Sequence, residues 1–302
     1  VQWPDEWRTL VDQMRAAPWK VFWDLFSGTA RATQGFNEPG WCVGSPVDVA
    51  DNPAVNQLNP AFIALAIALL WEGLIAVLWL GPPSSSFSMA VNRFWSHAMR
   101  DQWSPDGFSW FNGIKLEKVL LGNALATIAC RLFNIAVLAG SLVILEQPST
   151  SLMWLFQPFN DLHESVKGWF GNRDVCLDGA PWRKPTSFYS NEKAITAISG
   201  VCNCSVKHIA SVGKCERTGE NWTKIAGPYW PGAVRTVQKP FRAYARQRKS
   251  DNPVHKSGCW AGTSKTVLEE LNGCHAVWSR SAHSIAAGAS TGIQAAGEGL
   301  PQ

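Results

Sequence analysis

A turn of small residues follows a candidate strand near the start of the chain, and acidic side chains lie close to it. Residues 20–26 (KVFWDLF) read as a buried strand, residues 27–29 (SGT) follow at once, and a second candidate strand, residues 41–47, ends beside Asp48. Small side chains let a ligand approach the backbone, and a carboxylate after the next strand can accept from ribose hydroxyls. The pattern is typical of a nucleotide-type site, although a tight strand-to-helix connection can look the same.

Thiol and imidazole side chains gather later in the chain. Cys202, Cys204, His208 and Cys215 offer four soft ligands of the kind that zinc prefers. Their spacing, C-x-C-x3-H-x6-C, differs from the standard zinc motifs, and isolated cysteines commonly pack as small apolar residues. We therefore expect no bound metal, and keep these four residues as the alternative.

A basic stretch covers residues 221–250, which contain seven lysines and arginines, several aromatic residues and no acidic residue. Cations contact phosphates and aromatic rings stack on bases, so the stretch suits a nucleic acid. A run of charge is equally the solvated face of an ordinary domain. The candidates for nucleic-acid contact are Lys224, Arg235, Lys239, Arg242 and Arg246.

Two long apolar stretches supply the elements that would position these groups. Residues 61–80 and 119–145 carry one charge each, and each is long enough to span a membrane. Each, however, divides at a glycine, Gly73 or Gly140, into a helix-like half and a short β-rich half that ends at a polar turn. This alternation predicts a parallel sheet buried on both faces, and it favours an α/β protein over a membrane protein.

The composition agrees with a folded α/β protein. The chain has 302 residues, 46% of them hydrophobic and 17% charged, which excludes disorder throughout and suffices for one large domain or two small ones. A net charge of +4 permits an anionic partner without requiring one. Eight cysteines scattered over so long a chain favour a reducing, intracellular compartment. The charged, tryptophan-containing first residues lack the apolar core of a signal peptide.

The pattern predicts four parts. Residues 1–18 form a helical segment, whose helix over residues 5–17 ends at Pro18. Residues 19–191 form the α/β domain, with two short strand-like pieces within 173–191. Residues 192–250 form a small irregular region that bears the Cys/His group and the basic stretch, and the Ala/Gly/Ser-rich tail, residues 251–302, is expected to be disordered.

Three short motifs, taken in order, resemble those of DNA cytosine-5 methyltransferases. Residues 24–29 (DLFSGT) resemble the cofactor loop, 81–88 (GPPSSSFS) the nucleophile loop and 146–148 (EQP) the Glu-Asn motif. More narrowly, the chain is similar to divergent methyltransferase-like proteins associated with mobile elements, which share WLGPP, an RKPT motif and a late Gly/Lys-rich segment. The resemblance covers roughly residues 19–234. It implies a class I, Rossmann-like fold with S-adenosyl-L-methionine above the carboxyl ends of a mostly parallel sheet.

The resemblance also implies positions for the cofactor. Asp24, Phe26 and Gly28 would lie along its methionine part, and Asp48 would meet the ribose. Asn56 is the nearest candidate for the adenine contact, where the family usually has Asp.

The family's reaction needs a thiolate and a carboxylic acid. The thiolate adds to C6 of a flipped-out cytosine while the acid holds N3, and C5 then accepts the methyl group. The resemblance places Glu146 at the acid and Arg183 near the arginine motif around the base, but Ser84 stands where the cysteine should be. A serine hydroxyl needs a positioned general base, and none is evident. We therefore expect a cofactor-binding protein that is impaired as a catalyst, a pseudoenzyme that acts on DNA rather than RNA and in the nucleus.

Plainer interpretations stay open for the same residues. Glu146 could be a solvated or capping glutamate, Arg183 a loop cation, and residues 84–86 the cap of a following helix. The protein would then be a non-catalytic nucleic-acid or protein interaction module on the same fold. A small membrane protein is the third alternative.

Overall fold

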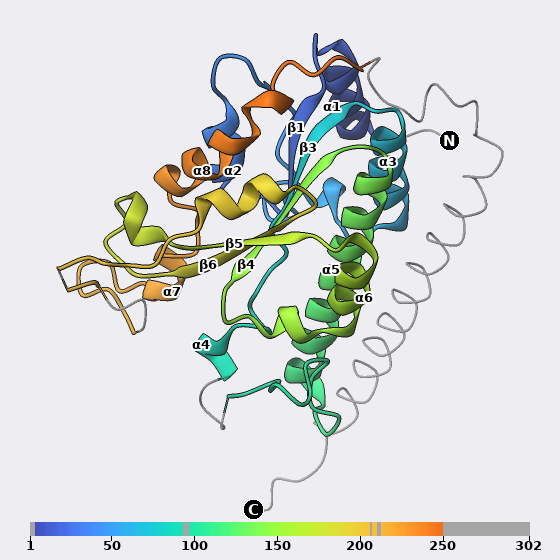
Figure 1. The fold of residues 1–302 in the computed structure, drawn as a ribbon. Coiled ribbons are helices and arrows are strands. Elements are labelled where there is room, and N and C mark those ends of the chain that lie inside the picture. Colours follow the sequence, from blue (N-terminus) through green and yellow to red (C-terminus); the bar gives the residue numbers. More distant parts are fainter. Residues whose placement is uncertain (1–3, 93–96, 206, 210–212, 250–302) are drawn as a thin grey trace, which may run out of the picture.

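The computed structural model describes residues 4–92, 97–205, 207–209 and 213–249. Within these ranges, six strands form one mixed sheet in the order β2-β1-β3-β4-β6-β5, with helices on both faces (Figure 1). Strands β1 to β4 run parallel, and β6 runs antiparallel to both of its neighbours. The architecture is α/β and compatible with a Rossmann-like fold, which confirms the predicted mostly parallel sheet.

The central strands β1, β3 and β4 are buried and mostly apolar, as the sequence predicts. The strands are β1 (Val21–Leu25), β2 (Cys42–Val43), β3 (Ile75–Leu80), β4 (Leu142–Pro148), β5 (Trp169–Asp174) and β6 (Pro185–Ser190). The prediction of a continuous strand over residues 41–47 is wrong: β2 stops at Val43, and Val47 forms only an isolated bridge with Leu25. Pro46 lacks the backbone N–H that a continued ladder would need.

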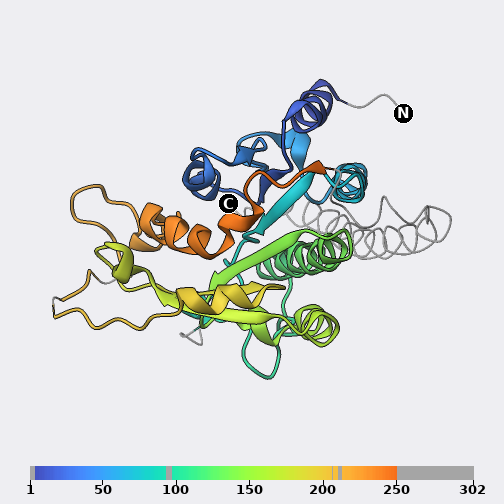
Figure 2. The same cartoon turned by 45° about the horizontal axis from the view of Figure 1, so that its top comes forward.

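Helices cover both faces of the sheet (Figures 1 and 2). One face packs against α1 (Asp5–Ala16), α3 (Pro60–Trp71), α5 (Gly113–Leu138) and α6 (Gln157–Val166). The other face packs against α2 (Arg31–Phe36), α8 (Pro231–Gln238) and two 3-10 helices, η4 (Lys193–Ile198) and η5 (Lys239–Tyr244). The remaining short helices are α4 (Met89–Asn92), α7 (Trp222–Ile225), η1 (Pro53–Val55), η2 (Leu152–Leu155) and η3 (Val175–Asp178).

Both apolar stretches divide as predicted. The first gives α3 and β3 and the second gives α5 and β4, with Gly73 (φ 69°) and Gly140 (φ 78°) just after each helix. A left-handed glycine there satisfies the last helical carbonyls and turns the chain back to the sheet. Helix α5 is long and apolar enough to cross a membrane, but most of its apolar window is buried here. Because core helices share these properties, α5 is weak evidence of a span.

The predicted boundary between residues 191 and 192 does not separate two cores. Ile195, Val234 and Phe241 lie in one buried cluster with Phe22 and Trp79 of the central strands. The segment after β6 is therefore part of the layer that covers the sheet. The tail, residues 251–302, lies outside the described residues.

Strand β1 marks the point where the strand order reverses, because β2 lies on one side of it and β3 on the other. In open parallel sheets, ligands bind outside the carboxyl ends of the strands at such a reversal. The loops that leave the sheet there begin at Phe26 and Gly81, and Gly81 N–H donates to the carbonyl of Leu25 at 3.2 Å. The two motifs that the sequence singles out therefore lie together at this reversal.

Candidate functional site

The turn after β1 has an unusual backbone. Phe26 (φ 60°), Gly28 (φ 53°) and Ala30 (φ 55°) all adopt left-handed conformations within five residues. For Phe26 and Ala30 this costs about 1–2 kcal/mol each. Such strain persists only where the surroundings fix it, and here Ser27 N–H donates to the carbonyl of Val47 at 3.1 Å. The turn is thus held in one shape at the reversal point of the sheet, as in many ligand sites.

Open space and unsatisfied polar atoms lie at this turn. A Cβ atom added to Gly28 would meet nothing within 4 Å. Among the described residues, neither Ser27 Oγ nor Asp24 Oδ1 has a hydrogen-bond partner, although both atoms are buried. Asp24 Oδ2 accepts from the backbone N–H (3.2 Å) and hydroxyl (2.9 Å) of Thr33. Burial raises the pKa of Asp24 to about 7.

Asp48 lies against the turn after β1. Its carboxylate accepts from the backbone N–H groups of Gly28 at 2.8 Å and Ala50 at 2.9 Å. A carboxylate offers about four lone pairs, so Asp48 keeps the capacity to accept from hydroxyl groups as well. Asn56 has a local contact instead: its side-chain oxygen accepts from the N–H of Leu58 at 2.9 Å.

Glu146 lies at the carboxyl end of β4 and is only 6% exposed. The Tyr229 hydroxyl donates to its Oε2 at 3.2 Å, whereas its buried Oε1 has no partner among the described residues. Burial raises the pKa of Glu146, opposed by the positive charge of Lys184 and the hydrogen bond from Tyr229. The interpretation of Glu146 as a solvated glutamate is therefore wrong.

A narrow cavity opens beside Glu146. Its lining includes Lys184, whose Nζ donates to the carbonyl of Gly227 at 3.1 Å, and the rings of Trp182 and Trp230, which meet edge to face at 5.7 Å. Aromatic walls with one acid and one base enclose about 10 Å³, which is the space of one water molecule.

The loop of residues 81–88 is tied to β4 through Gln147. The side-chain amide of Gln147 donates to the carbonyl of Pro82, and the Ser151 hydroxyl donates to Gln147 Oε1 at 3.1 Å. Gln147, which stands where the resembling family has Asn, therefore positions the loop that carries Ser84. Ser84 itself is partly exposed.

The interpretation of residues 84–86 as a helix cap is wrong. The Ser88 hydroxyl accepts from the N–H of Ala90 at 3.2 Å at the start of α4. The Ser86 hydroxyl instead accepts from the buried guanidinium of Arg100 at 2.8 Å. The cap lies at Ser88 because α4 begins at Met89, later than the serine run suggests.

Arg183 and Lys184 take different directions. Arg183 Nε donates to the buried carboxylate of Asp174 at 3.1 Å, and Arg183 is not among the residues that line the cavity. Lys184 lines it instead. The structure therefore brings Glu146 together with Lys184 rather than with Arg183.

The sequence predicts Tyr229 as one of the stacking aromatic residues of the basic stretch and does not predict its contact with Glu146. Tyr229 is separated from Glu146 by 83 residues, and no local spacing connects the two. A further signal is its position next to Trp230 after Gly227-Pro228, a turn-like dipeptide before α8.

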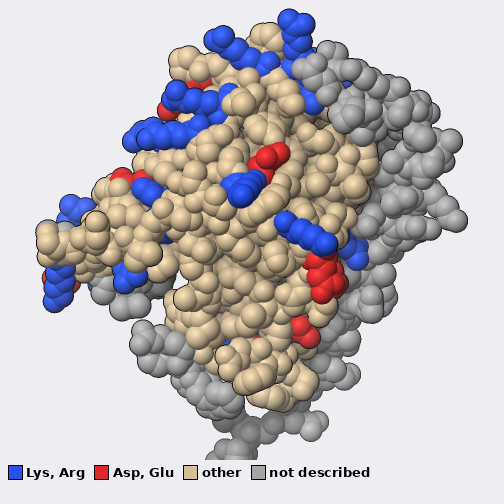
Figure 3. Space-filling model, in the orientation of Figure 1, with Lys and Arg blue, Asp and Glu red and all other residues tan. Residues whose placement is uncertain are grey.

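Four predicted nucleic-acid contacts form a stripe, which we call the basic stripe. Arg235, Lys239, Arg242 and Arg246 are all exposed along α8, η5 and the residues just after. Arg235 lies on α8, Lys239 and Arg242 lie on η5, and Arg246 follows η5. Figure 3 shows lysine and arginine gathered at the upper left, where Figure 1 has α2 and α8. The side chain of Lys224 lies outside what the structure describes.

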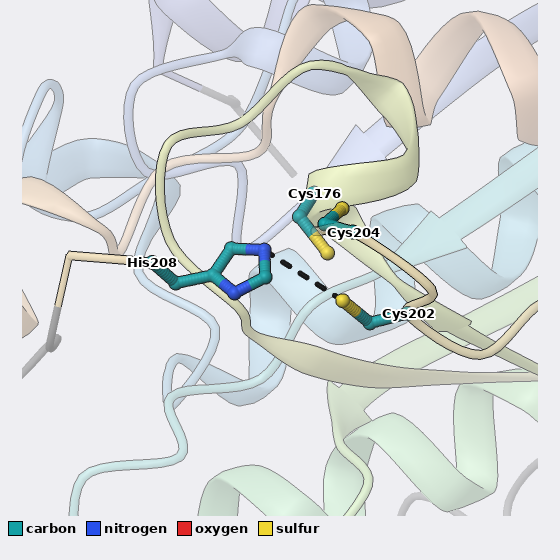
Figure 4. Close-up of side chains that lie close together, drawn as sticks. All are labelled: Cys176, Cys202, Cys204 and His208. Atoms are coloured by element: carbon teal, nitrogen blue, oxygen red, sulfur yellow. Dashed lines mark hydrogen bonds between the residues drawn. The ribbon is translucent and has the colours of Figure 1, made fainter. Parts of the chain in front are cut away.

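Three of the four predicted soft ligands come together, and the fourth is replaced. Cys202, Cys204 and His208 lie beside Cys176, with their ligand atoms all within 4.8 Å of one another (Figure 4). The inclusion of Cys215 was wrong, because that thiol lies in its own turn, hydrogen-bonded to Thr218. We call Cys176, Cys202, Cys204 and His208 the thiol cluster.

A comparison of the chain with family models, with curated proteins and with solved structures finds no match. The site itself therefore carries the case for a function.

Proposed function

We propose that the chain is an S-adenosyl-L-methionine-binding protein of class I methyltransferase fold and DNA cytosine-5 type, impaired as a catalyst because Ser84 occupies the position of the nucleophile. The observation that carries the proposal is Glu146, a buried carboxyl with one unsatisfied oxygen at the carboxyl end of β4. The mostly parallel sheet with β6 reversed between β4 and β5 is compatible with this fold.

The turn after β1 suits the proposed cofactor. Gly28 leaves open space, and Ser27 Oγ and Asp24 Oδ1 are buried polar atoms whose hydrogen-bonding capacity is unused among the described residues. Leaving such atoms unsatisfied costs about 1–3 kcal/mol each, which a polar ligand would recover. When bound, the cofactor supplies an activated methyl group. Asp24, Ser27 and Asp48 would hold it, and Phe26 would fix the shape of the turn.

Glu146 can hold a cytosine through a proton on Oε1. The raised pKa favours the protonated carboxyl, and the Tyr229 hydroxyl already occupies Oε2. A proton on Oε1 can therefore be donated to a ring nitrogen such as N3. Lysine and aromatic rings line the cavity, but its volume of about 10 Å³ holds one water molecule, so a base taken out of a helix would enter only after the cavity widens.

The nucleophile is the weak part of the site. Ser84 needs a base to remove its proton, whereas a cysteine thiol is partly ionised at neutral pH. Glu146 cannot serve as that base, since the proposal requires it as an acid. His97, thirteen residues after Ser84, is exposed. Transfer to C5 should therefore be slow in the protein as it stands.

Tritium transfer from labelled S-adenosyl-L-methionine to cytosine-containing DNA tests the proposal. We expect background transfer by the unmodified chain, a gain for Ser84→Cys, and its loss when Glu146→Ala is added. Ser85→Cys, which places a thiol on the neighbouring exposed residue, is the matched control and should stay at background. Robust transfer by the unmodified chain would contradict the impaired-catalyst assignment.

A non-catalytic interaction module is the second candidate. The contact between Tyr229 and Glu146 favours it, because the phenol occupies one oxygen of the carboxyl that a base would need. The exposed basic stripe gives such a module a surface for nucleic acid. DNA binding combined with an inactive Ser84→Cys variant would favour this candidate.

A further inference from the structure

The thiol cluster is assembled from separate parts of the chain. Cys176 lies in η3, directly after β5, whereas Cys202, Cys204 and His208 lie in the loop that follows β6 and η4. Figure 4 shows the four side chains turned toward one another. Cys202 Sγ lies 3.7 Å from His208 Nε2, and all four ligand atoms lie within 4.8 Å of one another.

These distances approach those of a tetrahedral zinc site. Zn–S bonds of about 2.3 Å and Zn–N bonds of about 2.0–2.1 Å place neighbouring ligand atoms about 3.5–3.8 Å apart. The separation between Cys202 and His208 already fits, and the longest separation needs to shorten by about 1 Å. Three thiolates with one imidazole is a standard ligand set of structural zinc.

Hydrogen bonds behind the thiol cluster hold the backbone of Cys202 in place. Buried Asp174 accepts from the backbone N–H of Cys202 at 2.7 Å, and its own N–H donates to the carbonyl of Gly200 at 3.1 Å. The same carboxylate accepts from Arg183 Nε at 3.1 Å. Three thiolates around Zn²⁺ leave a net charge of about −1, which the Arg183 guanidinium would offset.

We infer that Cys176, Cys202, Cys204 and His208 bind one structural zinc ion, which fastens the loop after η4 to the end of β5. The site adjoins the Glu146 cavity without sharing its side chains: Val175, which precedes Cys176, lines the cavity, as does Trp182. Zinc would thus stabilise one wall of the cavity. The inference does not rest on the proposed function, since no residue of the thiol cluster lines the cavity.

Metal analysis of the full chain, purified without chelator, tests the inference. We expect about one zinc ion per chain, falling to background in Cys176→Ser and in His208→Ala. Cys215→Ser is the matched control, because it removes a neighbouring thiol outside the cluster and should keep the zinc. Replacement of zinc by Co²⁺ should give the visible bands of a tetrahedral thiolate complex in the unmodified chain and in Cys215→Ser.

A readout on the unmodified chain keeps the test decisive if a variant fails to fold. Titration with a mercurial should release the zinc as three thiols react. Folded chain that binds neither zinc nor Co²⁺ would overturn the inference, as would equal zinc loss in Cys215→Ser. A disulfide between Cys176 and Cys202 or Cys204, found by alkylation and mass analysis without reductant, would overturn it too.

Discussion

The hydroxyl of Tyr229 donates to Oε2 of Glu146 at 3.2 Å and joins the segment before α8 to the end of β4. Burial raises the pKa of both groups, and for Tyr229 the nearby carboxyls Glu146 and Asp24 add to the effect. The phenol also fills the space over Gly81, where an added Cβ would lie 2.2 Å from the Tyr229 hydroxyl oxygen. One side chain thus controls both access to Glu146 and the space over Gly81.

Replacing Gly81 by alanine should destabilise the protein through this contact. The new methyl group overlaps the Tyr229 hydroxyl, so we expect Gly81→Ala to lower the free energy of unfolding by about 1–3 kcal/mol, as for other overpacked sites. Urea unfolding measures it. Because the ring carbon Cζ lies 3.4 Å from the added Cβ, Tyr229→Phe should relieve most of the overlap. An equal cost of Gly81→Ala in both backgrounds would show that the contact is absent.

Asp24 should make stability fall as pH rises from about 4 to about 7. The folded pKa of about 7 exceeds the unfolded value of about 3.9, so the folded state binds more protons in this range. The stabilisation is fully present below about pH 4 and is lost as pH rises through 7.

Asp24→Asn tests this dependence, since Asn can still accept from Thr33. We expect the free energy of unfolding of Asp24→Asn to depend less on pH than that of the unmodified chain. The difference in this free energy between the variant and the unmodified chain should shift in favour of the variant by on the order of a few kcal/mol from pH 4 to pH 8, measured by urea unfolding across the range. Asp51→Asn, which removes an exposed carboxyl, is the control and should leave the profile unchanged. If the stability of Asp24→Asn falls with pH as much as that of the unmodified chain, the pH dependence comes from another group.

The basic stripe should supply most of any affinity for DNA. Each neutralised phosphate contributes about 0.9 to the slope of log affinity against log salt on duplex DNA, so four contacts contribute up to about 3.6. Replacement of all four cations by glutamine should flatten the slope by that order, measured by fluorescence anisotropy. Deletion of the stripe is unsuitable, because Val234, Val237 and Phe241 belong to the core.

The exposed Lys118 on α5 provides the control for loss of charge alone. Lys118→Gln should change the slope by much less than one contact. An affinity that keeps its full salt dependence after the four replacements would place the binding surface elsewhere.

Features that depend on residues close together in the chain could be predicted from the sequence. The helix-to-strand divisions at Gly73 and Gly140 are local, since composition changes on either side of each glycine and the helix must end there. The meeting of Gly28 with Asp48 needs more than that, because β2 stops at Val43 and an isolated bridge between Val47 and Leu25 brings Asp48 to the turn. The strand predicted over residues 41–47 was too long, because it included Pro46, which has no N–H to extend the hydrogen bonding of β2.

Tertiary contacts decide the rest of the site. Cys176 joins the thiol cluster from 26 residues before Cys202, and no motif spacing connects them. Tyr229 reaches Glu146 only because α8 packs on the sheet. Arg183 and Lys184 differ only in the direction that each side chain takes at the start of β6, which composition does not encode.

Calorimetric titration of the full chain with S-adenosyl-L-methionine tests the central claim most directly. Gly28→Val should abolish binding by filling the open space at the turn, whereas Gly113→Val should retain it. Gly113 has the same φ of 53° and the same open surroundings, but it begins α5. The two variants therefore share the backbone strain, and only Gly28→Val places the new side chain at the turn after β1. We predict saturable binding by the unmodified chain and by Gly113→Val, and none by folded Gly28→Val. Absence of binding by the folded, unmodified chain, or unchanged affinity in Gly28→Val, would contradict the cofactor site proposed at this turn.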